Sequence, residues 1–207
     1  MKHMTKLSAA GSALAIAGVL ALSGQAMADQ VNAEYTGMTQ TISVDYSVVL
    51  PPDGGPPTPV TKTGTTTTGI FNFTDASGPI LTFGNDEFVS FCIDLEDEIV
   101  PNEYTWDVVS LAGAPDTTAG PMGTTKANAI AKMLGGAISS GVLNDARDLG
   151  IVQKQAMQLA IWEVVHEMPG TAYDLESGNM DFTSGVTFAH LSLANDYFGF
   201  INDTNVT

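Results

Sequence analysis

The stretch IVQKQAMQLAIWEVVHEMPG, residues 151–170, decides between an all-β chain and one that mixes strands with helices. Its apolar positions recur at helical spacing and form a stripe that faces a core. Those positions are Val152, Ala156, Leu159, Ala160 and Val164. Pro169 and Gly170 stop the pattern, because proline disfavours helical geometry in the residue before it. The sequence therefore predicts a helix from about Ile151 to Glu167.

Two further helices are predicted on either side of this one. An Ala-rich run begins at a cap on Thr124 or Thr125 and continues to Gly135-Gly136. Its apolar positions are Ala127, Ile130, Ala131 and Leu134. Residues 144–150 have the composition of a loop, so we expect them to connect this helix to the central one. A third helix is expected over residues 187–198, after a segment rich in Gly, Ser and Asp.

The chain before Thr124 has the pattern of β-strands. Short runs alternate between apolar and polar residues and are rich in β-branched and aromatic side chains. These runs cover residues 31–35, 41–49, 67–74, 80–83, 87–93 and 104–110. Residues 51–66 are rich in Pro, Gly and Thr, and we expect a long exposed hairpin loop there. The predicted fold class is therefore α+β, a β-rich barrel or sandwich with an appended or inserted helical segment.

Four regions follow from this pattern. They are a signal peptide at residues 1–28, a β-rich part at 29–123, a helical part at 124–168 and a C-terminal segment at 169–207. The sequence stops at Thr207 on polar residues, without an anchor or a closing strand. We therefore expect the natural protein to continue, and the segment from Gly170 onward to be partly unsupported.

The first 28 residues have the features of a cleavable secretory signal peptide. Lys2 and Lys6 supply positive charge, an apolar run covers residues 7–22, and Ala26-Met27-Ala28 provides small residues before a cleavage point. The run is shorter than the roughly 20 residues of a membrane span, although an uncleaved N-terminal anchor is the alternative. We expect an exported bacterial protein, secreted or at the cell surface, whose fold begins at Asp29.

The chain that remains after cleavage is strongly acidic. Two of the seven Lys and Arg residues precede Asp29, which leaves five basic residues against 23 acidic ones, a net charge of −18. Such a surface repels nucleic acid and anionic membranes, and it favours solubility. We expect no nucleic-acid partner and no membrane contact apart from an anchor beyond the end of this sequence.

Cys92 is the one cysteine of the chain. It has no partner for an internal disulfide, and the sequence contains no Cys/His cluster of the kind that binds metal. The acidic run at residues 94–98 follows directly, but it lacks the spacing and the glycine of a calcium loop, so we interpret it as a solvated turn. Three roles stay open for Cys92: a buried core thiol, an intermolecular disulfide partner, or a reactive group.

Two short motifs occur together. Phe91-Cys92-Ile93 places the cysteine between apolar neighbours, and Met157-Gln158-Leu159-Ala160-Ile161-Trp162 places a glutamine inside an apolar helix. This pair resembles the signature of bacterial surface thioester domains, which are adhesins that combine a β-rich barrel or sandwich with a helical part. The same FCID and QLAIWE stretches are similar to exported Gram-negative proteins that end in a Pro-Glu-Pro sorting tail, a tail that this sequence lacks.

The resemblance implies that Cys92 and Gln158 condense into an internal thioester with loss of ammonia. A thioester is an activated acyl group that survives only where apolar walls exclude water. The candidate walls are Phe91, Ile93, Met157, Ile161 and Trp162. An amine on a protein, a polyamine or a glycan would then take the acyl group of residue 158 and release the thiol. Such a protein reacts once, so it is not an enzyme, and it needs no cofactor or metal.

Other interpretations of these residues remain open. Cys92 is also typical of an inert core thiol, and Trp162 of a core aromatic residue. His166 could assist acyl transfer, but the favoured account is a partly exposed histidine at a helix end. Cys92 with His166 and Glu163 or Glu167 supplies the residue types of a cysteine hydrolase.

A structural extracellular or matrix module without covalent chemistry is a further class. The thioester hypothesis makes a geometric prediction that separates it from the others: the side chains of Cys92 and Gln158 should be in contact where the strands and the helices pack, with the sulfur near the amide carbon.

Overall fold

The computed structural model describes residues 29–50, 59–77, 88–95, 99–116, 120–142, 150–168 and 170–203. Two predicted elements, the signal peptide and the strand at 80–83, lie outside these ranges. So do residues 51–58 of the predicted loop and 144–149 of the predicted connection.

The described parts of the chain confirm the predicted α+β class. Their strands are β1 (Asp29–Leu50), β2 (Val60–Ser77), β3 (Phe88–Ser90), β4 (Asn102–Val108), β5 (Pro115–Asp116), β6 (Gly120–Pro121) and β7 (Met180–Ser184). Their helices are α1 (Gly123–Ser139), α2 (Ile151–His166), α3 (Phe188–Asn202) and the short 3₁₀ helix η1 (Leu111–Gly113).

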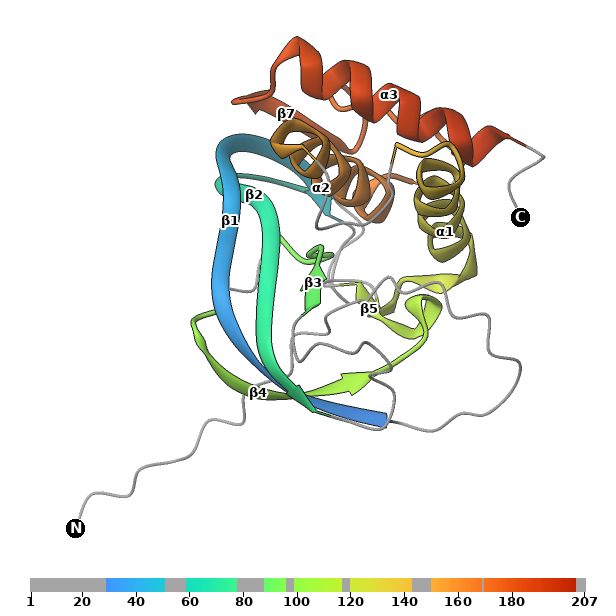
Figure 1. Ribbon diagram of the computed structural model, residues 1–207. Helices are drawn as coiled ribbons and strands as arrows, with labels where there is room; N and C mark the ends of the chain where they lie inside the picture. The colour runs from blue at the N-terminus through green and yellow to red at the C-terminus, as the bar shows by residue number, and fades with distance from the viewer. Residues whose placement is uncertain are drawn as a thin grey trace.

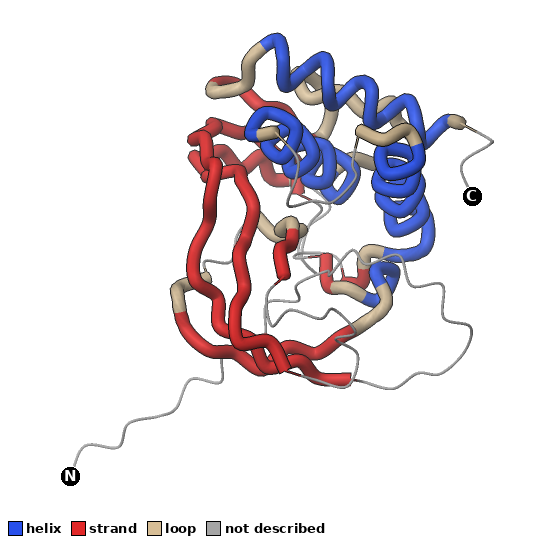
Figure 2. The backbone as a smooth tube through the Cα atoms, viewed as in Figure 1, coloured by secondary structure: helices blue, strands red, loops and turns tan. Residues whose placement is uncertain are grey.

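An antiparallel sheet built on β1 and β2 forms one layer (Figures 1 and 2). β3 pairs with the outer edge of β2, and the opposite edge of β1 is shared by β4 at one end and β7 at the other. Asp45 on β1 ties neighbouring strands together, since its carboxylate accepts hydrogen bonds from Thr65 on β2 and Ser184 on β7, each at 2.6 Å. These hydrogen bonds lower the pKa of Asp45.

The two strands predicted at 31–35 and 41–49 are one long strand, β1. Its pairing with β2 shifts register at three places between Asn32 and Ile42, and Gln40 has a positive φ of 56°. Such bulges interrupt the alternation of side chains, so the sequence pattern shows a gap that the backbone does not have. The predicted hairpin is present, but β2 begins at Val60, so part of the expected loop is strand.

α2 is the central helix of the fold. It packs against β1 and β2 on one side and against α1 and α3 on the other (Figure 1). The predicted bounds hold to within one residue, but the expected one-sided stripe is wrong, because every residue from Lys154 to His166 is buried. A helix covered on all sides no longer needs a polar face. Val152 is also wrong as a core position, since it lies in the exposed first turn.

α1 is longer than the sequence predicts. It starts at Gly123 without a side-chain cap from Thr124 or Thr125, and it continues through Gly135-Gly136 to Ser139. Gly136 does not end this helix because its role is packing: a Cβ added there would overlap the ring of Phe200 on α3. The absent side chain therefore allows α3 to approach α1 closely.

Gly136→Ala should destabilise the protein by about 1–3 kcal/mol, because the new methyl group must displace Phe200 or the backbone of α3. Gly199→Ala, next to Phe200 on α3, is the matched control, since a Cβ at that position meets nothing within 4 Å. It should be neutral or stabilising by up to about 1 kcal/mol through helix propensity. Urea denaturation of both variants measures this, and equal effects would contradict the packing role of Gly136.

The C-terminal segment is better supported than we expected. β7 joins the main sheet beside β1, and α3 packs against both α1 and α2. The expectation of a partly unsupported segment after Gly170 is therefore not met for residues 180–202. β7 was not predicted, because its five residues carry too short an alternation to indicate a strand.

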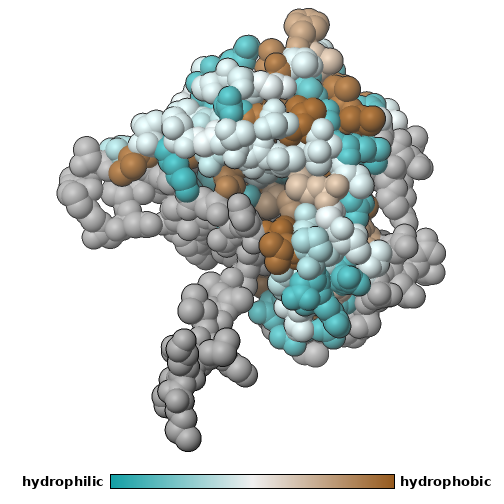
Figure 3. All heavy atoms as spheres, turned by 90° about the vertical axis from the view of Figure 1, so that its left-hand side faces the viewer, coloured by the Kyte–Doolittle hydropathy of each residue, from teal (hydrophilic) through white to brown (hydrophobic). Residues whose placement is uncertain are grey.

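The surface carries hydrophobic residues in several separate groups among hydrophilic ones on the face shown in Figure 3. Phe188, at the start of α3, is the most exposed large apolar side chain of the described residues, at 84%. Within the described ranges, no helix combines the length and the apolarity needed to cross a membrane.

Candidate functional site

Gln158 lies in the middle of α2 and is completely buried. Its side-chain amide makes two hydrogen bonds to the backbone of Cys92, a residue 66 positions earlier in the chain. The N–H of Cys92 donates to Oε1 at 2.8 Å, and Nε2 donates to the carbonyl oxygen of Cys92 at 2.6 Å. The structure thus holds the side chain of Gln158 against the backbone of Cys92 at the junction of the sheet and the helices, while the predicted contact between the sulfur and the amide carbon stays a prediction.

The position of Cys92 explains why it needs such a partner. It follows β3 by two residues, where the pairing of β3 with β2 has ended. A buried backbone N–H and C=O without partners would each cost about 1–3 kcal/mol. The Gln158 amide supplies one donor and one acceptor, as a neighbouring strand would. This arrangement by itself accounts for a buried glutamine, with or without covalent chemistry.

The thiol of Cys92 lies in a polar turn. Its Sγ donates to the carbonyl oxygen of Asp94 at 3.0 Å, and the N–H of Asp94 points back at the sulfur at 3.4 Å. The side chain is partly buried and packs against both hydrophobic clusters of the protein. Burial, together with the nearby Cys92, raises the pKa of Tyr35.

The predicted apolar walls all belong to one buried cluster. Its members include Phe91, Ile93, Met157, Ile161 and Trp162. Within the described part of the chain, the indole Nε1 of Trp162 and the hydroxyl of Ser90 are buried without a hydrogen-bond partner. Trp162 stands one helical turn after Gln158, and Ser90 precedes Cys92 by two residues. Two buried groups whose N–H or O–H makes no hydrogen bond therefore lie close in sequence to the pair, one near Cys92 and one near Gln158.

His166 is buried, at 8% exposure, so the interpretation as a partly exposed helix-end residue is wrong. It ends α2, eight residues after Gln158, which is about 12 Å along the helix axis. A cysteine hydrolase requires its base within hydrogen-bond reach of the nucleophile. Cys92 contacts the helix at Gln158, two turns away from His166.

Glu163 and Glu167 bind the backbone of the segment that follows α2. Glu163 Oε1 accepts from the N–H of Asp174 at 3.0 Å, and Glu167 accepts from the N–H groups of Met168 and Asn179, each at 2.8 Å. Glu163 is fully buried, and this burial raises its pKa to about 8. The hydrogen bond from the Asp174 N–H lowers the pKa, but it offsets only part of the effect of burial. Both carboxylates therefore fix the segment after α2, and neither is shown orienting His166.

A second buried glutamine, which the sequence analysis missed, locks α2 to its neighbours. Gln155 Nε2 donates to the carbonyl of Gln40 in the β1 bulge at 2.8 Å, and its Oε1 lies 3.0 Å from His190 Nε2. The N–H of Thr187 donates to His190 Nδ1, so the proton of the ring is on Nε2 and points at Gln155. Burial lowers the pKa of His190. No local sequence signal marks this network.

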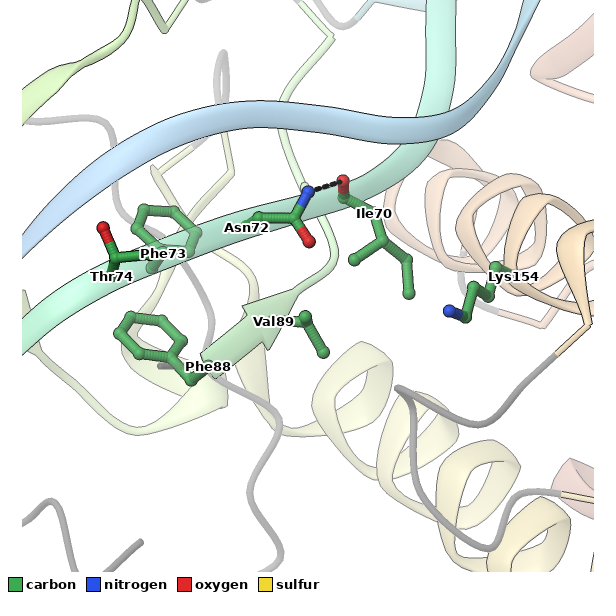
Figure 4. Close-up of a pocket in the computed structure, with 7 residues that line it drawn as sticks. All are labelled: Ile70, Asn72, Phe73, Thr74, Phe88, Val89 and Lys154. Carbon is green, nitrogen blue, oxygen red and sulfur yellow. Dashed lines mark hydrogen bonds between the residues drawn. The ribbon is translucent and has the colours of Figure 1, made fainter. Parts of the chain in front are cut away.

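A cavity of about 230 Å³ lies between β2, β3 and the first half of α2 (Figure 4). Its lining includes Lys154, which is buried at 5% exposure. The sequence analysis missed this residue as well, because a lysine in an amphipathic pattern normally indicates a solvated face. Among the described residues, no group of three or more His, Cys, Asp and Glu side chains is arranged to hold a metal ion.

Comparison of the chain with protein-family models, curated proteins and solved structures gave no match. The geometry around Cys92 and Gln158 is therefore the only basis for a function of this chain among the features described above.

Proposed function

We propose that this chain is an exported adhesion-type protein whose Cys92 and Gln158 form an internal thioester that binds a partner amine covalently. The observation that carries the proposal is the pair of hydrogen bonds that hold the buried Gln158 amide against residue 92. The predicted signal peptide and the acidic composition support export and a soluble exterior.

The contacts of the pair suit the chemistry of thioester formation. The sulfur of Cys92 attacks Cδ of Gln158, the C–S bond forms, the C–N bond breaks, and the amide nitrogen leaves as ammonia after taking up the thiol proton. Negative charge develops on Oε1 in the tetrahedral intermediate. The Cys92 N–H already donates to that oxygen at 2.8 Å, which is the arrangement that stabilises an oxyanion.

The second step attaches the partner. An amine attacks the carbonyl carbon of residue 158, a new C–N amide bond forms, and Cys92 leaves as a thiol that carries the proton of the amine. The apolar cluster around Trp162 limits the competing attack by water. The protein and its partner are then joined through residue 158, and no further cycle follows.

Intact mass spectrometry tests the proposal directly. The purified wild-type protein should be one ammonia lighter than its sequence requires, and Cys92 should not react with a thiol reagent. Methylamine should add at residue 158 and make the thiol reactive. Cys92→Ala and Gln158→Ala should each abolish the mass deficit and the labelling. Gln153→Ala, in the exposed first turn of the same helix, should retain both.

Two results would contradict the proposal. A wild-type protein of full mass that ignores methylamine has no thioester. A protein that lacks one ammonia but has a reactive Cys92 thiol contains a different link, for example an amide between Lys154 and residue 158, which are one helical turn apart.

A structural extracellular module is the second candidate, and one observation favours it. The two hydrogen bonds to Cys92 give Gln158 a structural role that needs no reaction. This candidate predicts full mass, a buried thiol and no uptake of amine, so the same spectra decide between the two functions.

A further inference from the structure

His190 connects three elements of the fold at one buried point. It lies in the first turn of α3, a helix that packs on α1 and α2 (Figure 1), and its side chain is only 3% exposed. The ring contacts Gln155 on α2, and Gln155 in turn donates to the carbonyl oxygen of Gln40 in the β1 bulge at 2.8 Å. One chain of hydrogen bonds therefore holds the start of α3 on both the central helix and the sheet.

This chain of hydrogen bonds requires a neutral imidazole ring. Nδ1 of His190 accepts the N–H of the N-cap residue Thr187 at 3.0 Å, and Nε2 donates to Gln155 Oε1 at 3.0 Å. A second proton on the ring would bind to Nδ1 and face the Thr187 N–H, so two donors would oppose each other. The Thr187 hydroxyl, 3.0 Å from Nδ1, can accept that proton, but the Thr187 N–H still loses its acceptor.

The position of the ring also opposes a positive charge. Burial lowers the pKa of His190, because the charged form would lose its contact with water. His190 is the third residue after the N-cap of α3, and the helix dipole disfavours a cation at a helix N-terminus. Protonation therefore weakens the contact through burial, the helix dipole and the lost hydrogen bond together.

Among the described residues, no acidic side chain is shown in contact with the ring. On β1, residues 36–42 are uncharged, and Asp45 is bound by hydrogen bonds from β2 and β7. On α2 the charged residue next to the contact is a cation, Lys154, and the nearest acidic residue, Glu163, comes more than two turns later. On α3 the nearest acidic residue is Asp196, which follows the ring by six positions. A protonated ring thus gains no ion pair that would offset its burial.

We propose that His190 is a pH-sensitive switch: protonation of its ring in acid releases the start of α3 from Gln155 and opens the contact between α3 and α2. Release uncovers an apolar helix face that is hidden at neutral pH, because the buried residues that follow His190 at helical spacing are apolar or aromatic. These residues are Ala194, Tyr197 and Phe198. The switch does not depend on the proposed thioester.

The direction of the pH effect follows from the direction of the shift. Because burial lowers the pKa of His190 in the folded protein, its contribution to stability is complete above the ordinary value of 6.5 and is lost as the pH falls below that value. Glu163, whose pKa is raised, contributes in the opposite direction. Acid should therefore loosen α3 and not the protein as a whole.

Hydrogen exchange followed by NMR tests the switch in the wild-type protein. The protection factors of the α3 amides should fall about tenfold between pH 7 and pH 5, while those of β1 and β2 should not fall. His190→Gln keeps a donor for Gln155, and His190→Asn keeps an acceptor for the Thr187 N–H. Neither side chain can be charged, so each variant should abolish the acid-dependent loss. His166→Gln, at the other buried histidine of the described residues, should retain it.

The uncovered helix face gives a second measurement. Fluorescence of the dye ANS, which binds exposed apolar surface, should rise below about pH 6 in the wild type and in His166→Gln but not in His190→Gln. Equal protection of α3 at pH 5 and pH 7 in the wild type would overturn the switch. A loss of protection that both His190→Gln and His190→Asn retain would also overturn it, because another group would then control the opening.

Discussion

Glu163→Gln should remove a large pH dependence from the stability of this protein. The carboxyl group is fully buried, and burial raises its pKa in the folded protein from an ordinary 4.5 to about 8. Between these two values the folded state holds a proton that the unfolded chain has released. The free energy of unfolding should therefore fall by roughly 1.4 kcal/mol for each pH unit as the pH rises through that range.

The sign of the effect follows from the direction of the shift. The contribution of Glu163 is fully present below the unfolded pKa near 4.5 and is lost as the pH rises through about 8. A glutamine at this position carries no charge at any pH, and its oxygen can still accept the N–H of Asp174. The variant should thus match the wild type in acid and become the more stable protein near pH 8.

Urea denaturation at pH 5, 6 and 7 measures this difference. From pH 5 to pH 7 the wild type should lose roughly 3 kcal/mol relative to Glu163→Gln. Glu176→Gln is the matched control, because Glu176 is an exposed carboxylate of the neighbouring segment, and its substitution should leave the slope unchanged. If the free energies of unfolding of the wild type and Glu163→Gln differ by the same amount at every pH, Glu163 titrates as it does in the unfolded chain.

The environment of Glu163 also shows where the sequence analysis failed. Residues 170–179 fold back on the helix, since the backbone N–H groups of Asp174 and Asn179 bind Glu163 and Glu167. That segment reads as a polar loop, and nothing local indicates that it folds back over the end of the helix. An exposed helix end was the reasonable expectation from periodicity, and a long-range contact overturned it.

The parts that the sequence predicted well are those governed by local rules. α2 was predicted to within one residue because Pro169 ends the pattern, and the hairpin of β1 and β2 followed from a Pro/Gly-rich break between β-branched runs. The predicted end of α1 was wrong, because Gly136 allows close packing against α3 and does not end the helix.

The meeting of Cys92 and Gln158 was anticipated from motifs, not from physics. Periodicity places Gln158 on a buried helix, but no spacing rule connects it to a residue 66 positions away. Conversely, Lys154 and Gln155 carry contacts that no motif indicated. Polar residues on a helix are assigned to solvent by pattern, so sequence analysis does not detect the buried polar groups of a helix that is covered on every side.

Gln158→Glu should be the most destabilising of the single polar changes proposed for this site, by roughly 3–5 kcal/mol at pH 7. One carboxylate oxygen can still accept the N–H of Cys92, but the other must face the carbonyl oxygen of Cys92, which the wild-type Nε2 approaches at 2.6 Å. Two acceptors then oppose each other at a site without exposure to solvent. The cost should shrink in acid, where a protonated carboxyl group can donate to that oxygen.

Gln153→Glu supplies the matched control on the same helix. Gln153 lies in the first turn, and its Oε1 accepts the N–H of Gly150 at 2.6 Å, a contact that a carboxylate can retain. A negative charge at a helix N-terminus is favourable, so this variant should be neutral or slightly stabilised. Similar losses for both substitutions in urea denaturation would contradict the special position of Gln158.

The same contact should distinguish the two fates of the proposed thioester at residue 158. Attack by water leaves a glutamate, which is the Gln158→Glu protein, whereas attack by an amine leaves a neutral secondary amide, whose oxygen can still accept the Cys92 N–H and which places no negative charge against the Cys92 carbonyl. The methylamine-labelled protein should therefore exceed the hydrolysed protein in stability by roughly 2–4 kcal/mol at pH 7. Thermal unfolding of the two forms measures this, and equal stability would mean that the site opens after reaction and no longer holds residue 158 against Cys92.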